Sequence, residues 1–229
     1  MREIVIDTQT TGFDALIGDR VVEIGCIELL NHIPTGNEYQ VYINPERDMP
    51  SGAFEVHGLS EAFLSDKPLF ADIVDDFLGF VGDDKLVAHN ASFDMGFINA
   101  ELGRLKRPAI AMSQAIDTVA MARRKFPGAP AGLDALCRRF AVDASARTHH
   151  GALLDAGLLA EVYLALIGGR QPGLSLAAST IDKTSSLSAA PETASETRTR
   201  EPRPHTSTDE EVAAHAAFVD GLKDPLWRR

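Results

Sequence analysis

The chain has 229 residues, of which 45% are hydrophobic, and a formal net charge of −11. This length allows one full domain plus an appendage, with enough apolar residues for a hydrophobic core. The negative charge excludes a protein that coats nucleic acid by bulk attraction, so any contact with nucleic acid should be local and assisted by metal ions. Two distant cysteines indicate reduced thiols, and no apolar run approaches the ~20 residues of a membrane helix. We therefore expect a soluble cytoplasmic protein with no membrane partner.

The start of the chain is predicted to form an antiparallel meander of three strands. The apolar run Ile4–Ile6 indicates a buried strand, and residues 20–30 alternate as a second strand. Residues 39–44 indicate a third strand, after a loop that contains Pro34 and Gly36. The links are short and carry no helical pattern, which favours antiparallel neighbours.

Helices then alternate with strands. Apolar residues at helical spacing predict helices over 70–81, 93–105, 119–126, 133–140 and 151–167, and short apolar runs predict strands over 85–90 and 116–118. Antiparallel strands followed by β–α units predict an α/β fold, with a mixed sheet flanked by helices.

The composition changes after this folded part. Residues 173–208 are rich in Ser and Thr and contain no aromatic residue, which is too little apolar surface to offset the entropy of ordering. We therefore expect a folded domain, a flexible linker and a short helical tail, with boundaries at residues 1–170, 171–208 and 209–229.

The tail carries a helix signal of its own. Thr208 and Glu211 form a capping-box pattern, and apolar residues follow at helical spacing until Pro225 stops the helix. The only tryptophan, Trp227, lies at the extreme end. A helix too short to fold alone favours docking on a partner protein, and folding back onto its own domain is the alternative.

Three carboxyl groups in a particular order suggest chemistry. Asp7 ends the first apolar run and is followed by small hydroxyl residues up to Gly12, so we expect it at the mouth of the sheet. Asp94 lies in the first turn of a predicted helix and Asp155 lies on the last long helix. Each has an ordinary explanation by itself, as a turn cap or a carboxylate favoured by the helix dipole. Together they suit a divalent metal ion, because hard cations prefer oxygen ligands.

A histidine precedes the third carboxyl group by five residues. Positions five apart on a helix point ~140° apart, so His150 and Asp155 can face one site only if His150 lies before the helix begins. A histidine on such a loop can act as a general base towards a metal-bound water. The five-residue spacing favours His150 over its neighbour His149.

In this order, the three motifs resemble the DEDDh group of 3′–5′ exonucleases, and specifically the DnaQ-like family of epsilon, the proofreading subunit of bacterial DNA polymerase III. The resemblance covers about residues 2–170. It implies a ribonuclease-H-like fold with a five-stranded mixed sheet. It also implies two Mg²⁺ or Mn²⁺ ions and the release of 5′-mononucleotides from a DNA 3′ end.

The resemblance also assigns roles to residues. It implies that Asp7 and Asp155 hold the first metal ion, that Asp94 completes the acidic cluster, and that His150 deprotonates the attacking water. His57 matches a histidine that lines the nucleotide pocket, although a loop histidine with no such role is the alternative. The residues that it implies for metal binding are Asp7, Gln9, Asp94 and Asp155, and those for DNA binding are Asp7, Gln9, Thr10, Thr11, Gly12, His57, Asn90, Phe93 and Asp155.

One residue departs from the family pattern. Where the family has Asp-x-Glu-Thr-Thr-Gly, this chain has Gln9 in place of the glutamate that binds metal and contacts the terminal sugar. Gln9 keeps the shape and loses the charge, which should weaken metal binding and misplace the water. We therefore expect the chain to bind a DNA 3′ end but to cleave poorly. The alternative is an inactive scaffold that bridges polymerase and sliding clamp, and an RNA-trimming enzyme is a weaker third interpretation.

Two further segments resemble protein-binding peptides. Residues 171–176 are similar to the short peptide that bacterial replication proteins insert into the sliding clamp, with the candidate contacts Gln171, Leu174 and Leu176. The end of the chain is similar to the epsilon tail that binds the polymerase alpha subunit, with the candidate contacts Val212, Phe218, Leu222, Leu226 and Trp227. A small third core subunit is a further expected partner.

Overall fold

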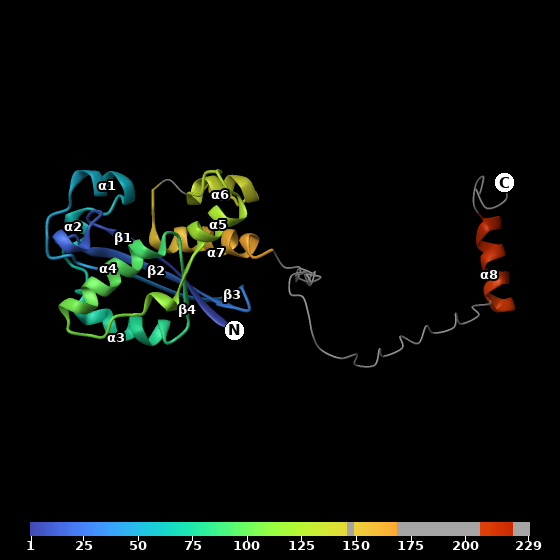
Figure 1. Ribbon diagram of the computed structural model, residues 1–229, viewed down its shortest axis with the longest axis horizontal. Coiled ribbons are helices and arrows are strands. Elements are labelled where there is room, and N and C mark those ends of the chain that lie inside the picture. Colours follow the sequence, from blue (N-terminus) through green and yellow to red (C-terminus); the bar gives the residue numbers. More distant parts are fainter. Residues whose placement is uncertain (146–148, 169–206, 222–229) are drawn as a thin grey trace, which may run out of the picture. The chain divides into compact units, whose positions relative to one another are not determined.

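The computed structural model describes residues 1–145, 149–168 and 207–221. The chain divides into two compact units, Met1–Leu176 and Ala177–Arg229, and each is described by itself. The first unit holds a five-stranded sheet with helices on both faces (Figure 1), as predicted for a ribonuclease-H-like α/β fold.

The sheet is mixed and has the strand order β3-β2-β1-β4-β5. Three antiparallel strands form one side of it, namely β1 (Arg2–Thr10), β2 (Val21–Leu30) and β3 (Ile33–Tyr42). Two short strands continue the other side parallel to β1, namely β4 (Lys85–Ala88) and β5 (Ala115–Asp117). The antiparallel meander predicted for the start of the chain is therefore confirmed.

The predicted start of the third strand is wrong. β3 begins at Ile33, and Pro34 pairs with Leu29 of β2 instead of lying in a loop. The connection is a tight turn at Asn31 and His32, whose φ angles of 51° and 67° are both left-handed. A proline is tolerated there because β3 lies at the edge of the sheet, where a missing N–H costs little.

The helices cover the two faces of the sheet in separate groups. α3 (Phe70–Val81) and α4 (Ala91–Arg104) pack on one face with Ile4 and Ile6 of β1. α5 (Thr118–Lys125), α6 (Leu133–Phe140) and α7 (Ala152–Leu166) pack on the other face with Val5. Successive β1 residues thus enter opposite hydrophobic layers, as the period of a strand requires. These five helices lie within two residues of their predicted ranges.

Two short helices were not predicted. α1 (Ser51–His57) buries only His57, and α2 (Glu61–Leu64) buries only Leu64. A single buried residue produces no apolar stripe, so their sequences carry no periodic signal. Two 3-10 turns, Ala15–Ile17 and Met112–Gln114, were also missed, because they bury no residue.

The described part of the second unit is the helix α8 (Asp209–Asp220). The predicted capping box is confirmed, because the Glu211 amide donates to Thr208 Oγ1 at 3.3 Å and the Thr208 amide donates to Glu211 Oε2 at 2.9 Å. Val212 and Phe218 are 54% and 64% exposed. The other candidate contacts for clamp and polymerase lie outside the described residues, namely Gln171, Leu174, Leu176, Leu222, Leu226 and Trp227.

Among the helices of the described ranges, none is long and apolar enough to cross a membrane.

Candidate active site

Asp7 lies where β1 runs past the end of a neighbouring strand. β4 pairs with β1 only from Glu3 to Val5, so beyond Val5 that side of β1 is open. β1 continues through Thr10 and stays paired with β2, so Asp7 lies inside a strand and not at its end as predicted. In mixed α/β sheets, ligands bind at the carboxyl ends of parallel strands, and this is the position that Asp7 occupies beside β4.

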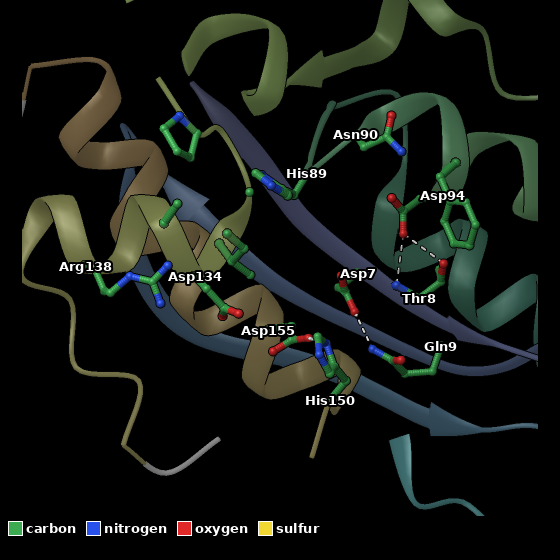
Figure 2. Close-up of a pocket in the computed structure, with 15 residues that line it drawn as sticks. Asp7, Thr8, Gln9, His89, Asn90, Asp94, Asp134, Arg138, His150 and Asp155 are labelled. Atoms are coloured by element: carbon green, nitrogen blue, oxygen red, sulfur yellow. Dashed lines mark hydrogen bonds and ion pairs between the residues drawn. The ribbon is translucent and has the colours of Figure 1, made fainter. Parts of the chain in front are cut away.

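Asp94 is held against β1 from the face of the sheet on which α4 packs. It lies in the first turn of α4, and its Oδ1 accepts hydrogen bonds from the Thr8 amide at 3.0 Å and from Thr8 Oγ1 at 2.8 Å (Figure 2). Burial raises the pKa of Asp94 to about 7, even though the Thr8 hydrogen bonds act in the other direction. Thr8 therefore fixes the position of the Asp94 carboxyl group. A cation nearby would favour the ionised form of that group.

Asp155 and His150 come from α7 and the residues before it. α7 begins at Ala152, so His150 precedes the helix, as its spacing from Asp155 required. His150 Nδ1 lies 3.0 Å from Asp155 Oδ2, and the His150 side chain is 45% exposed while that of Asp155 is 2% exposed. The His150 amide also donates to the carbonyl of Val56 at 3.1 Å, which fastens this segment to α1. If Nδ1 donates to Asp155, Nε2 is the nitrogen that can accept a proton.

Gln9, the residue that differs from the family pattern, contacts the carboxyl group of Asp7 directly. Gln9 Nε2 donates to Asp7 Oδ2 at 2.9 Å (Figure 2), and Gln9 is buried. Across the strands, Gln9 is opposite Glu23 of β2 and Asp7 is opposite Gly25. Gln9 is thus a neutral donor to Asp7, in the place where the family pattern has a carboxyl group.

The pKa of Asp7 is raised well above its usual range. Burial is the largest cause, followed by repulsion from Asp94, Asp155 and Glu23, while the hydrogen bond from Gln9 opposes them. A divalent cation would relieve this repulsion, and the oxygen donors around Asp7 are those that hard cations prefer. The donor set therefore fits divalent metal ions. Within the described ranges, no group of three or more His, Cys, Asp or Glu side chains already has the geometry to hold an ion.

A cavity of about 530 Å³ joins these groups. It contains Asp7, Gln9, Asp94, His150 and Asp155 together, and its far wall is formed by α6 (Figure 2). Several lining residues were not predicted, because nothing in their spacing distinguishes them from an ordinary amphipathic helix or loop. These are Thr8, His89, Pro130, Gly132, Leu133, Asp134, Ala135 and Arg138.

A second cavity of about 480 Å³ meets the first at Thr8, Gln9 and Phe93. The predicted DNA-binding residues divide between the two cavities: Asn90 lines the first only, and the second is lined by Thr10, Thr11, Gly12 and His57. Three residues of the following turn, Phe13, Asp14 and Ile17, also line the second cavity.

His57 is the buried last residue of α1 and faces this second cavity. Its Nδ1 accepts a hydrogen bond from the Leu59 amide at 3.0 Å, so Nε2 carries the proton. Burial lowers the pKa of His57, the Thr10 backbone opposes this effect, and His150 adds to it. A neutral histidine with a fixed tautomer can offer one N–H to a ligand in the cavity.

The fold and this site define a 3′–5′ exonuclease with a ribonuclease-H-like fold. The chain belongs to the exonuclease family, whose model, described as "Exonuclease", matches residues 4–163. A similar solved structure is that of exonuclease X in complex with 5′ overhanging duplex DNA, with a TM-score of 0.56 and 26% identity, covering 72% of this chain and 90% of that one. The nuclease domain of 3′hExo, a DEDDh family member bound to rAMP, shares the fold at a TM-score of 0.62 and 16% identity, covering 72% of this chain and 91% of that one.

Within this class, the chain belongs with the epsilon subunits of DNA polymerase III. It is 48% identical to DNA polymerase III subunit epsilon of Rickettsia felis, over 97% of each chain. It is 41% identical to the epsilon subunit of Escherichia coli K12, covering 99% of this chain and 97% of that one. The DEDDh type implies divalent metal ions, in agreement with the donor set around Asp7.

Proposed function

We propose that the chain is the cytoplasmic proofreading subunit of a bacterial replicative DNA polymerase. It hydrolyses the 3′-terminal phosphodiester of DNA and releases 5′-mononucleotides. The observation that carries this proposal is the convergence of Asp7, Asp94 and Asp155, from three separate elements, on one cavity with His150. The near full-length similarity to epsilon subunits supports the biological setting.

The carboxyl groups are proposed to hold two divalent ions, Mg²⁺ or Mn²⁺. Asp7 and Asp155 would hold the first ion, Asp7 would also reach the second, and Asp94 and Gln9 would complete the set. When bound, such a pair of ions stabilises both the attacking and the leaving oxygen of an in-line displacement at phosphorus.

His150 is proposed to act as the general base. Its Nδ1 faces Asp155 Oδ2, which orients the ring and stabilises the imidazolium that forms when Nε2 takes a proton from water. Because the side chain is 45% exposed, it can rotate between the water and solvent to deliver that proton.

The second cavity is proposed to bind the terminal nucleoside. Phe93 lies where the two cavities meet and offers an aromatic face for a base, and His57 Nε2 offers a proton donor. Thr10, Thr11 and Gly12 place backbone close to the sugar and phosphate. Asn90 lies on the cavity that holds the carboxyl groups, where the next nucleotide would pass.

Gln9 is proposed to slow this reaction. Its amide occupies Asp7 Oδ2 as a donor and supplies one negative charge fewer than a glutamate would. With one negative charge fewer, the site should bind metal ions more weakly and hold them less well placed for the reaction. A second candidate function, a catalytically inactive scaffold between polymerase and clamp, rests on this same residue.

The second unit is proposed to recruit partners. The exposed Val212 and Phe218 of α8, with Leu222, Leu226 and Trp227, would bind the polymerase alpha subunit, and residues 171–176 would bind the sliding clamp. A small third core subunit is also proposed. Attachment through residues 171–208 would raise the effective concentration of the nuclease at the primer end.

The test is the release of mononucleotides from single-stranded DNA labelled at its 3′ end, with Mg²⁺ or Mn²⁺. We expect slow release by the chain, and a loss of about 10²-fold in His150→Gln. His149→Gln is the matched control, because His149 precedes it directly and its ring lies beside Gly58. Equal losses in the two variants would contradict the assignment of the base.

A further inference from the structure

α7 is attached to the sheet by a buried glutamate near each end. Near its C-terminal end, Tyr163 Oη donates to Glu3 Oε1 of β1 at 2.7 Å, and Glu3 is 0% exposed. At its N-terminal end, the Ala152 amide donates to Glu23 Oε2 of β2 at 3.0 Å, and Glu23 is 1% exposed. The two attachments are about 16 Å apart along the helix, at 1.5 Å per residue.

The attachment at the N-terminal end replaces a missing helix cap. The N-cap residue of α7 is Gly151, which has no side chain to accept a hydrogen bond from the first-turn amides. Glu23 supplies that acceptor from β2. Its other oxygen, Oε1, accepts a hydrogen bond from Gln40 Nε2 of β3 at 2.8 Å, so Glu23 is held from both sides.

β2 is also shaped to receive this turn of α7. A Cβ added at Gly25 would lie 2.2 Å from the Leu153 amide nitrogen and 2.3 Å from the Ala152 carbonyl carbon, so the two backbones are nearly in contact. Gly25 is opposite Asp7 in the sheet. The distance between the carboxyl groups of Asp7 and Asp155 therefore depends on how closely the first turn of α7 lies on β2.

We propose that Glu23 is a positioning residue for the proposed hydrolysis. It fixes the first turn of α7, which carries Asp155 and follows His150, against the strand beside Asp7. Small displacements of reacting groups cost large factors in rate, so loss of this attachment should lower turnover. Glu3, which holds the other end of α7, should contribute only to folding stability and not to turnover.

Three variants separate these roles. Glu23→Met removes the acceptor and keeps the length of the side chain. Glu23→Gln removes the charge but keeps an acceptor oxygen for the Ala152 amide, once the Gln40 amide turns over to face it. Glu3→Met is the matched control, because it removes the other buried attachment of the same helix.

Three quantities are measured on the full chain and on the same variants carrying Gln9→Glu. They are amide hydrogen exchange in the first turn of α7 without metal, Mn²⁺ affinity, and steady-state nucleotide release. We expect Glu23→Met to exchange at least about 10-fold faster at Ala152, bind Mn²⁺ about 10-fold more weakly and lose about 10- to 100-fold in kcat, with KM for DNA nearly unchanged. Glu23→Gln should restore most of all three, and Glu3→Met should change only the free energy of unfolding.

Three results would overturn the proposal. One is a wild-type Mn²⁺ affinity in Glu23→Met after protection at Ala152 has been lost. Another is a loss of Mn²⁺ affinity in Glu3→Met as large as that in Glu23→Met. The third, which does not require Glu23→Met to fold, is a large loss in Glu23→Gln with Ala152 still protected, since that effect would come from charge. If the parent chains release no nucleotide, the proposed function fails separately, and the exchange and Mn²⁺ data still decide the role of Glu23.

Discussion

The two ends of α7 use buried carboxyl groups in opposite ways. At the C-terminal end, Glu3 is satisfied by Tyr163 Oη at 2.7 Å and by His32 Nδ1 at 2.6 Å. At the N-terminal end, Asp155 lies among other carboxyl groups, and burial together with repulsion from Asp94 and Asp155 raises the pKa of Asp7. A buried carboxyl group that accepts hydrogen bonds stabilises the fold. Carboxyl groups buried close together repel one another, and a bound cation would relieve that repulsion.

The largest expected effect comes from removing one charge of the acidic cluster. In Asp94→Asn, the amide oxygen can still accept both hydrogen bonds from Thr8, so the fold should be kept. Loss of one unit charge about 4 Å from a cation costs at least about 4 kcal/mol at an effective dielectric constant of 20, or at least ~10³-fold in rate. Nucleotide release with Mn²⁺, and calorimetry of the metal-free variant, measure the two consequences. Wild-type release by Asp94→Asn would remove Asp94 from the metal site.

A second expected effect is a pH dependence that divalent ions reverse. The folded-state pKa of Asp94 is raised to about 7, and that of Asp7 is also raised, so the folded metal-free chain holds protons that the unfolded chain releases near pH 4. Their contribution to stability is full below about pH 4 and is lost as the pH rises through about 7. We expect the stabilisation by Mg²⁺ to grow between pH 5 and pH 8 in thermal unfolding. A stabilisation by Mg²⁺ that is constant with pH, or a pH dependence as large in Asp94→Asn as in the parent chain, would contradict this.

The smallest expected effect on activity comes from the other end of the helix. Tyr163→Phe leaves Glu3 with one donor fewer and should lower the free energy of unfolding by about 1–3 kcal/mol. Nucleotide release should stay within about twofold, because the first turn of α7 keeps its own attachment to Glu23. Urea unfolding and nucleotide release on the same sample give both numbers. If release falls together with stability, the two ends are not independent.

Much of the fold could be predicted because its periodic signals are strong. The apolar run Ile4–Ile6, whose residues enter both hydrophobic layers, and the apolar stripe of residues 70–81 were both visible in the sequence. The start of β3 was missed because a proline on an edge strand has the same appearance in sequence as one in a loop. α1 and α2 were missed because each buries only one residue.

The candidate site was predictable to a similar extent. The order of the carboxyl groups and the spacing between His150 and Asp155 were visible in the sequence, and these residues line one cavity. Glu23, Gly25 and Arg138 were not singled out, because their places beside the site depend on how β2, α6 and α7 pack. No local pattern records a contact between Glu23 and an amide 129 residues away.

Gln9 allows a direct test of the proposed metal site. Gln9 lies opposite Glu23 and donates to Asp7. Because Gln9 is neutral where the family has a glutamate, it reduces the negative charge of a site that is proposed to bind two divalent ions. The measurement is mononucleotide release from 3′-labelled single-stranded DNA with Mn²⁺, comparing the chain with Gln9→Glu. We expect at least about 10-fold faster release by Gln9→Glu, because the added charge strengthens metal binding. Equal and fast release by both forms would show that the amide is a sufficient ligand, and no release by either form would favour the scaffold.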